Sequence, residues 1–381
     1  MTGADTLTAV DGECVPAFAN VRAEFEKNFS AFEELGAAVA VTHHGKTVVD
    51  LWGGFRDAGQ MKPWQRDTLV CMMSVSKGVS ALAVHMLADR GALGLDSPVA
   101  EYWPEFARNG KSTIPVRWVL SHLAGIPVCD AAPPGSLYDW ETMVEAIAEQ
   151  EPLWAPGTNP CYHTNTMGFI CGELVRRITG QSIGSFVRTE ICAPLGIDFA
   201  IGLTAAEERR CAEMVPPGSG GPAAAEGYED LAERAMRPLP PGEDFNSHGW
   251  RSSEVPSGNG HGTARAIAQL YGALVGDGGG GDGALLSRKA LQAAIEEQWH
   301  GPTILPGLTL RTGLGFSLSC PPDRPMGPNP RAFGHPGAGG AQGFADPDAG
   351  IGFAYACNRM EPGRLPSPRA TRLIDAVFDC L

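Results

Sequence analysis

The sequence has no hydrophobic run long enough to cross a membrane. A span needs about 18 to 20 consecutive apolar residues, and no stretch of this chain reaches that length. The N-terminal residues MTGADTL contain neither a basic region nor an apolar stretch, so we expect no signal peptide. Together, these absences predict a cytoplasmic protein with no membrane partner.

Positive charge is also scarce. The 381 residues include 29 Lys and Arg against 43 Asp and Glu, which gives a formal net charge of −14. Proteins that bind nucleic acid or anionic lipid present an excess of positive charge to the phosphates. We therefore expect neither nucleic acid nor a membrane surface among the partners.

Metal-binding and redox motifs are missing as well. The ten cysteines never form C-x-x-C, and the nine histidines never form H-E-x-x-H, which are spacings typical of redox and zinc sites. We predict no metal and no cofactor. Several cysteines stand among apolar residues, which favours buried, reduced thiols over disulfides.

The chain does contain enough apolar sequence for a substantial core. Hydrophobic residues make up 43% and charged residues 19%, a composition typical of a folded protein rather than a disordered one. The length allows one large domain or two modest domains.

Strand patterns gather at the two ends of the chain, and helical patterns lie mainly between them. Strands are expected at 36–42, 47–54, 313–318, 343–346 and 350–356. Helices are expected at 18–32, 263–275 and 367–378. This arrangement predicts an α+β fold in which one antiparallel sheet joins the N-terminal hairpin to the C-terminal strands.

We expect a single catalytic unit over residues 1–381. The sheet subdomain would come from residues 1–70 and 300–381, and residues 71–299 would form a mostly helical subdomain. Within the helical part, residues 215–258 are punctuated by Pro and Gly, which predicts a lid-like excursion over the surface.

Lysine is among the rarer residues, and one lysine stands in a distinctive setting. Of the six lysines only Lys77 has a serine, Ser74, three residues before it. On a helix these two side chains share one face, one turn apart. The surrounding residues are apolar: Cys71, Met72, Met73, Val75 and Val79.

This setting predicts an activated nucleophile. Burial and the positive end of a helix dipole both lower the pKa of an amine, and an uncharged Lys77 amine at neutral pH accepts a proton. The Ser74–Lys77 pair would then supply a serine nucleophile and its base without a histidine.

Two later segments complete a pattern. The sequence reads YHTN at 162–165 and GHPGA at 334–338. With the S-x-x-K of Ser74 and Lys77 before them, this ordered set resembles the serine β-lactamase and penicillin-binding family. Within that family it is most similar to class C β-lactamases and family VIII carboxylesterases, and the similarity extends from residue 36 to residue 360.

The resemblance implies a β-lactamase/transpeptidase-like fold and a set of roles. Ser74 would be acylated, and Lys77 and Tyr162 would share the work of general base and general acid. The backbone N–H groups of Ser74 and Ala338 would form the oxyanion hole, in which each donor is worth about 3–4 kcal/mol of barrier stabilisation.

The substrate-binding positions depart from the β-lactamase pattern at two points. The third position of Y-x-N is Thr164, with Asn165 next, and His335-Pro336-Gly337 stands where K-T-G is usual. The lysine of K-T-G helps to bind the carboxylate of a β-lactam, whereas histidine is mostly neutral at pH 7. We expect Thr164, Asn165, His335 and Gly337 to line a substrate site that suits esters.

Two further features call for interpretation. Phe245 and Trp250, inside the 215–258 excursion, are expected to line an apolar acyl pocket.

Ser182 matches G-x-S-x-G, but that motif marks a nucleophile only on a strand-to-helix turn. Because the preceding segment at 172–179 reads as a helix, we expect Ser182 to punctuate helices instead.

The sequence is therefore expected to encode a serine hydrolase that cleaves carboxylic esters, mainly of short chains, through an acyl-Ser74 intermediate. On the same site the alternatives are a β-lactamase, a D-amino-acid peptidase or amidase, and an acyltransferase. An alternative of another class is a penicillin-binding sensor that acylates without turnover.

Overall fold

The fold is that of a computed structural model, which describes residues 9–217, 228–276, 284–304, 309–362 and 366–381. Residues 218–227 of the predicted excursion therefore lie outside the described part. No helix among the described residues combines the length and apolarity that a transmembrane segment needs.

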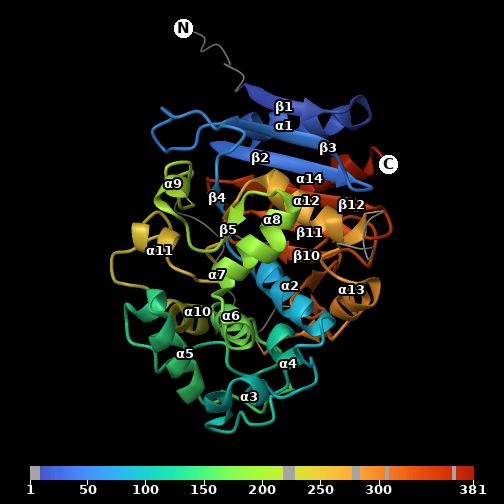
Figure 1. The fold of residues 1–381 in the computed structure, drawn as a ribbon. Coiled ribbons are helices and arrows are strands. Elements are labelled where there is room, and N and C mark those ends of the chain that lie inside the picture. The colour runs from blue at the N-terminus through green and yellow to red at the C-terminus, as the bar shows by residue number, and fades with distance from the viewer. Residues whose placement is uncertain (1–8, 218–227, 277–283, 305–308, 363–365) are drawn as a thin grey trace.

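A nine-stranded antiparallel sheet lies at the centre of the described chain, in the order β1-β3-β2-β12-β11-β10-β9-β8-β7. Its strands are β1 (Val10–Cys14), β2 (Gly36–His43), β3 (Lys46–Gly54), β7 (Trp299–Pro302), β8 (Thr309–Thr312), β9 (Ser317–Leu318), β10 (Phe333–Pro336), β11 (Gln342–Asp346) and β12 (Ile351–Cys357). β2 pairs with β12 along its length, with Val39 opposite Tyr355. The predicted joining of N-terminal and C-terminal strands is confirmed (Figure 1).

Part of the sheet differs from the prediction. The sequence did not indicate β1, β7, β8 or β10, which are four or five residues long and contain Gly, Pro or charged residues. The strand expected at 313–318 is confined to Ser317–Leu318. Before it the chain turns, because Gly315 has φ 82° and the Gly313 N–H bonds to the Phe316 carbonyl at 2.9 Å.

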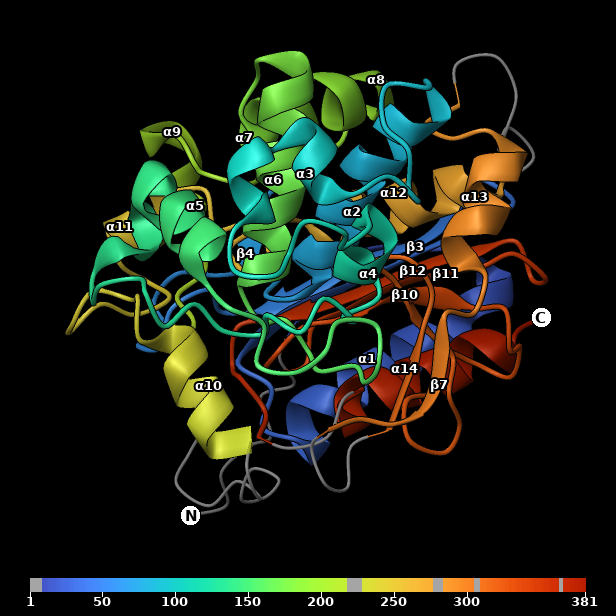
Figure 2. The same ribbon diagram turned by 90° about the horizontal axis from the view of Figure 1, so that it is seen from below.

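Helices cover both faces of the sheet (Figure 2). On one face, α1 (Ala19–Ala31) and α14 (Pro368–Phe378) pack through an apolar cluster that includes Phe25, Phe353 and Leu373. On the other face lie α2 (Val75–Asp89) and α12 (Ala264–Val275). The helices predicted at 18–32, 263–275 and 367–378 are confirmed to within a residue of their ends.

α12 lies unusually close to the sheet, although its sequence falls inside the range assigned to the helical subdomain. A Cβ atom added at Gly272 would lie 2.1 Å from Thr42 Oγ1 on β2. Such a separation is far below van der Waals contact, so glycine is what allows the helix backbone to reach the strand.

Ten further α-helices lie in the described chain. They are α3 (Val99–Tyr102), α4 (Val116–Leu120), α5 (Trp140–Glu149), α6 (Thr166–Thr179), α7 (Ile183–Phe186), α8 (Ala193–Leu195), α9 (Ala205–Glu208), α10 (Tyr228–Met236), α11 (His248–Ser252) and α13 (Arg288–Ile295). α6 packs against α2, and its buried residues include Phe169, Ile170 and Leu174. The excursion at 215–258 contributes α10 and α11.

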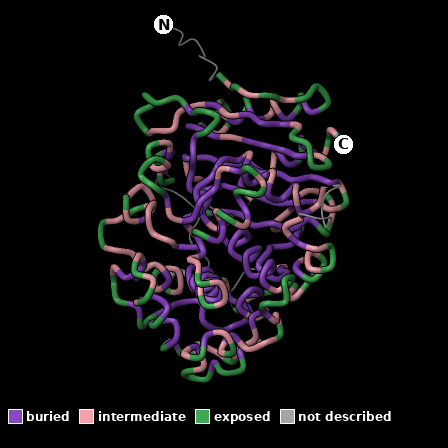
Figure 3. The backbone as a smooth tube through the Cα atoms, viewed as in Figure 1, coloured by how far each residue is buried: buried purple, intermediate pink, exposed green. Residues whose placement is uncertain are grey.

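A second sheet of three short strands, β4 (Val70–Cys71), β6 (His261–Gly262) and β5 (Phe199–Ala200), lies beside α2. Cys71 pairs with His261, and the Met72 N–H bonds to the Gly260 carbonyl at 2.8 Å. The chain that leads into α2 is thereby fixed against the 255–262 segment. Figure 3 shows that the backbone of this central region is mostly buried.

The close approach at Gly272 generates a stability prediction. Replacing Gly272 with Val should lower the free energy of unfolding by about 1–3 kcal/mol, because the added atoms overpack the α12–β2 contact. Ala273→Val, one residue along the same helix and half-buried, controls for the lower helix propensity of valine and should cost less than about 0.7 kcal/mol. Urea unfolding followed by circular dichroism measures both, and equal midpoints would contradict the proposed contact.

Candidate active site

Ser74 is placed at the start of α2 and is the one solvent-reaching residue in a buried stretch. All other residues of 68–87 are buried, and only Ser74 has an intermediate exposure. Its hydroxyl makes no capping hydrogen bond to the helix. Met73, immediately before it, has φ 48°, a left-handed conformation that costs an L-residue about 1–3 kcal/mol. The fold therefore holds Ser74 at a strained corner with its hydroxyl accessible.

Lys77 faces Ser74 one helical turn later, as the S-x-x-K spacing predicts. Lys77 Nζ lies 3.3 Å from Ser74 Oγ and 3.0 Å from the carbonyl oxygen of Ser257. The lysine side chain is 1% exposed and forms no ion pair with any described residue. Burial lowers the pKa of the Lys77 amine to about 7.

This geometry suits an uncharged amine. A neutral amine has two N–H bonds and one lone pair. One N–H donates to the Ser257 carbonyl, which leaves the lone pair available to the Ser74 hydroxyl at 3.3 Å. The Ser257 carbonyl is thus a functional group that no spacing rule reveals, since every residue carries one.

Tyr162 joins this pair from the segment before α6. Its ring centroid lies 4.6 Å from Lys77 Nζ, and the residue is partly exposed between the buried Cys161 and His163. The structure therefore brings together Ser74, Lys77 and Tyr162, the three residues predicted to carry the chemistry.

Three buried histidines surround the tyrosine. The rings of His122 and His335 lie 4.9 Å and 6.0 Å from the Tyr162 ring, and the ring of His163 lies 5.5 Å from that of His122. Burial lowers the pKa of His163 to about 4, that of His335 to about 3 and that of His122 well below its usual value. All three imidazoles are therefore neutral at pH 7, so they add no positive charge beside Lys77.

Hydrogen bonds indicate which ring nitrogen carries the proton in His335 and in His122. A carbonyl oxygen can only accept, so Nδ1 of His335 donates to the Pro336 carbonyl at 2.7 Å. Nε2 of His335 is then an acceptor. In His122 the arrangement is reversed, because Nδ1 accepts the His163 N–H at 3.2 Å. The neutral rings thus carry their protons on different nitrogens, Nδ1 in His335 and Nε2 in His122.

The predicted oxyanion donors lie on adjacent segments. A Cβ atom added at Gly337 would lie 2.4 Å from the Met72 carbonyl oxygen, so glycine lets the end of β10 reach the chain just before Ser74. Ala338, the next residue, is exposed. The backbone N–H groups of Ser74 and Ala338 find no hydrogen-bond acceptor among the described residues, which leaves both available to a ligand.

The predicted pocket residues have different surroundings. Thr164 is partly exposed beside Tyr162. Asn165 is buried, and its side-chain Nδ2 donates to the Ala235 carbonyl of α10 at 2.8 Å. Trp250 is also buried, and its ring lies 5.1 Å from that of the partly exposed Phe245. The acyl-pocket role of these two aromatic residues stays a prediction.

Ser182 has a structural environment. It is the N-cap of α7, where its hydroxyl oxygen accepts the Ser185 N–H and its hydroxyl donates to Glu254 Oε1 at 2.6 Å. No histidine or lysine contacts it in the described chain. The capping role agrees with the expectation that Ser182 punctuates helices.

The cysteines and acidic residues are not arranged as metal ligands. All ten cysteines are free, and eight of them are buried. Among the residues that the structure describes, no three His, Cys, Asp or Glu side chains gather as a metal site.

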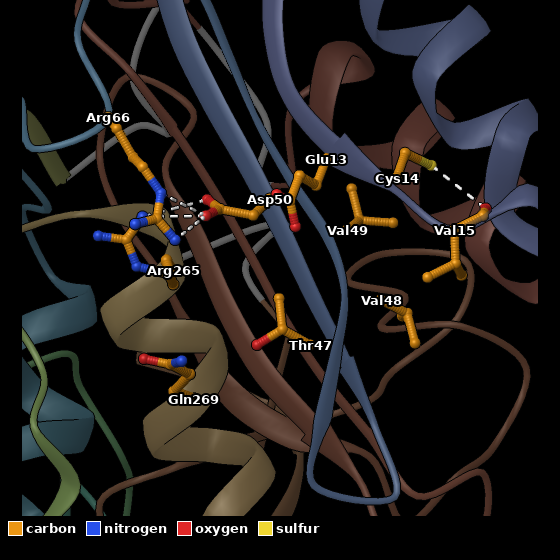
Figure 4. A pocket seen from close by; sticks show the side chains of 10 residues that line it. All are labelled: Glu13, Cys14, Val15, Thr47, Val48, Val49, Asp50, Arg66, Arg265 and Gln269. Carbon is orange, nitrogen blue, oxygen red and sulfur yellow. Dashed lines mark hydrogen bonds and ion pairs between the residues drawn. The ribbon is translucent and has the colours of Figure 1, made fainter.

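A separate cavity lies at the β1–β3 edge of the sheet (Figure 4). Its volume is about 330 Å³, and it is lined by residues of β1, β3 and α12 and by Arg66. At its centre Asp50 accepts from Arg66 Nε at 3.2 Å and from Arg265 Nη1 at 3.0 Å. Because the Asp50 carboxylate of β3 ties Arg265 of α12 and Arg66 to the strand, this cavity reads as a structural feature distinct from the Ser74 site.

Comparisons with known proteins agree with this geometry. A family model described as Beta-lactamase matches residues 25–378. The Mycobacterium tuberculosis protein named Esterase/beta-lactamase LipL is 34% identical over 384 residues, which cover 94% of this chain and 85% of that protein.

Solved structures extend the similarity to the fold. A crystal structure described as a family VIII carboxylesterase is 39% identical, with a TM-score of 0.90, and the match covers 98% of this chain and 100% of that one. A penicillin-binding protein homologue from Caulobacter crescentus is 37% identical, with a TM-score of 0.91 and the same coverage. The family model matches nearly the whole chain, and the S-x-x-K pair lies where the resemblance predicts it, so this chain belongs to the beta-lactamase family and has the fold of β-lactamases and penicillin-binding proteins.

Proposed function

We propose that this protein is a serine hydrolase that cleaves carboxylic esters through an acyl-Ser74 intermediate. The observation that carries the proposal is the 3.3 Å approach of the buried Lys77 amine to the one accessible hydroxyl of the surrounding buried stretch. Relatives described as an esterase/beta-lactamase and as a family VIII carboxylesterase support the same reaction class.

Acylation starts with proton transfer. The uncharged Lys77 amine takes the Ser74 proton as Oγ attacks the ester carbonyl carbon, which makes the oxygen nucleophilic at neutral pH. Negative charge develops on the carbonyl oxygen, where the N–H groups of Ser74 and Ala338 stabilise it. The support for this role is that neither N–H group has a hydrogen-bond acceptor among the described residues.

Collapse of the tetrahedral intermediate breaks the bond to the alcohol. The departing alkoxide takes a proton from the Lys77 ammonium, either directly or through the Tyr162 hydroxyl. Water then enters, gives its proton back along the same route and attacks the acyl carbon, which releases the acid and regenerates Ser74. The proton of Ser74 thereby leaves with the alcohol, a proton from water replaces it on Ser74 Oγ, and no cofactor is needed.

His335 favours an ester over a β-lactam as substrate. A β-lactam carries a carboxylate, which needs a cation or a hydrogen-bond donor. The His335 ring is neutral, and its Nε2 is an acceptor because Nδ1 donates to the Pro336 carbonyl. β-Lactam hydrolysis is nevertheless the second candidate, because the name of the LipL relative includes it.

We also propose a cytoplasmic location and a small-molecule ester as the partner. The support is chemical: all ten cysteines are free thiols, which suits a reducing compartment. The net charge of −14 disfavours nucleic acid as a ligand.

The nucleophile can be tested by two serine substitutions. Ser74→Ala should lower kcat for p-nitrophenyl acetate by on the order of 10³-fold or more, because the acyl-enzyme can no longer form. Ser182→Ala should leave kcat nearly unchanged, since Ser182 caps α7. Steady-state hydrolysis with both purified variants is the measurement, and the opposite ranking would refute the assignment of Ser74.

The state of Lys77 predicts a pH dependence. We expect kcat/KM for a neutral ester to rise as the pH increases through about 7, because only the uncharged amine accepts the Ser74 proton. Below that pH the rate should fall about tenfold per unit.

The measurement is kcat/KM from about pH 5.5 to 9, corrected for spontaneous hydrolysis, which reports ionisations of the free enzyme. Ser182→Ala is the control and should reproduce the wild-type curve. A flat profile, or a rate that still rises about tenfold per unit at pH 9, would contradict a Lys77 base that is uncharged near neutral pH.

His335 predicts the balance between two substrate classes. The wild-type protein should turn over p-nitrophenyl acetate with a higher kcat/KM than a chromogenic cephalosporin. His335→Lys should raise the cephalosporin-to-ester ratio by about 10- to 100-fold, because a charged donor is added for the carboxylate. His335→Leu, which adds neither a charge nor a hydrogen-bond donor, is the control, and a wild-type preference for the cephalosporin would overturn the esterase proposal.

A further inference from the structure

The end of α10 is held beside the Tyr162 segment by the side chain of Asn165. Asn165 Nδ2 donates to the Ala235 carbonyl at 2.8 Å and lies 3.8 Å from Met236 Sδ. Asn165 is 5% exposed, so this amide has little access to a substrate. Its function in the structure is to attach the last turn of α10 to the chain that carries Tyr162.

An ion pair holds the same helix from another direction. Arg234 donates two hydrogen bonds to Asp130, from Nε to Oδ1 at 3.0 Å and from Nη2 to Oδ2 at 2.6 Å. Bidentate pairs of this kind fix orientation as well as distance. Just beyond the helix, the Leu137 N–H bonds to the Pro238 carbonyl at 2.9 Å. α10 is therefore tied both to the 130–137 loop and to Asn165.

The backbone of Asn165 serves a different partner. Its carbonyl accepts the Ser257 hydroxyl at 3.1 Å, and the Ser257 carbonyl in turn accepts from Lys77. The main chain at Asn165 is therefore linked through Ser257 to Lys77, while its side chain is fixed to α10. One residue sets the distance between the helix and the reacting groups.

Met236 is the α10 residue whose side chain contacts Asn165. It is partly exposed and touches the Asn165 amide, while Ala235 next to it is buried. Along the neighbouring segment Tyr162 and Thr164 are also partly exposed. Asn165, which directly follows these residues in the chain, is thus in contact with an unbranched apolar side chain on a tethered helix.

We propose that Met236, held in place by Asn165 and by the Asp130–Arg234 pair, is a wall of the site that limits the length of the acyl group. The inference rests on the proposed ester hydrolysis. A methionine that blocks the acyl path makes short acyl esters the preferred substrates. Its removal, or the release of its helix, opens room for longer chains.

The test compares p-nitrophenyl acetate with p-nitrophenyl octanoate. Met236→Ala should raise the octanoate-to-acetate ratio of kcat/KM by about tenfold or more, the scale on which a pocket discriminates methylene groups. Asp130→Asn should raise the ratio in the same direction by releasing Arg234. Glu233→Gln, an exposed neutralising change on the same helix, should leave the ratio at its wild-type value.

The outcomes separate the two proposals. If the wild-type protein hydrolyses no p-nitrophenyl ester, the proposed function fails. If it hydrolyses acetate but the ratio is unchanged in Met236→Ala, the wall is refuted and the function stands. A second series of acetate esters with longer alcohols tests the side of the site, because an effect confined to the alcohol series would also refute an acyl wall. Thermal unfolding of each variant confirms that it is folded.

Discussion

A lysine amine enclosed in an apolar interior, with no carboxylate to neutralise it among the described residues, constrains everything around Ser74. Taking an ammonium out of water costs several kcal/mol, so Lys77 sheds its proton near neutral pH instead of staying charged. The groups around Lys77 are consistent with an uncharged amine. The Ser257 carbonyl accepts an amine proton, and the nearby histidines are neutral, so they add no positive charge beside the amine.

The reacting groups come from parts of the chain that meet only in the folded state. Ser74 and Lys77 belong to α2, Tyr162 precedes α6, and Ala338 follows β10. The small sheet sets the 255–262 segment against the start of α2, and a close approach at Gly337 sets the end of β10 against the same point. The site is therefore built where the large sheet, the small sheet and helices α2 and α6 converge.

How much of this could be predicted depends on how local each feature is. The Ser74–Lys77 contact follows from one helical turn, so sequence spacing was sufficient. Tyr162 and Ala338 came from the family resemblance, because nothing in their own neighbourhoods points to α2. The Ser257 carbonyl escaped prediction since it acts through the backbone, and β10 escaped because a short strand with Gly334 and Pro336 carries little periodicity. For Asn165 the residue was identified, but only the fold shows that its amide faces α10.

The pairing of β2 with β12 has a consequence for synthesis of the chain. β2 and β3 leave the ribosome roughly 300 residues before β12, and at about 5–20 residues per second that delay lasts about 15–60 s. Throughout it, the apolar edge of β2, with Ala38, Val39 and Val41, has no partner and can pair with strands of other nascent chains. Recovery of soluble protein from an expression host will therefore depend on chaperone supply and translation speed, whatever the stability of the finished molecule.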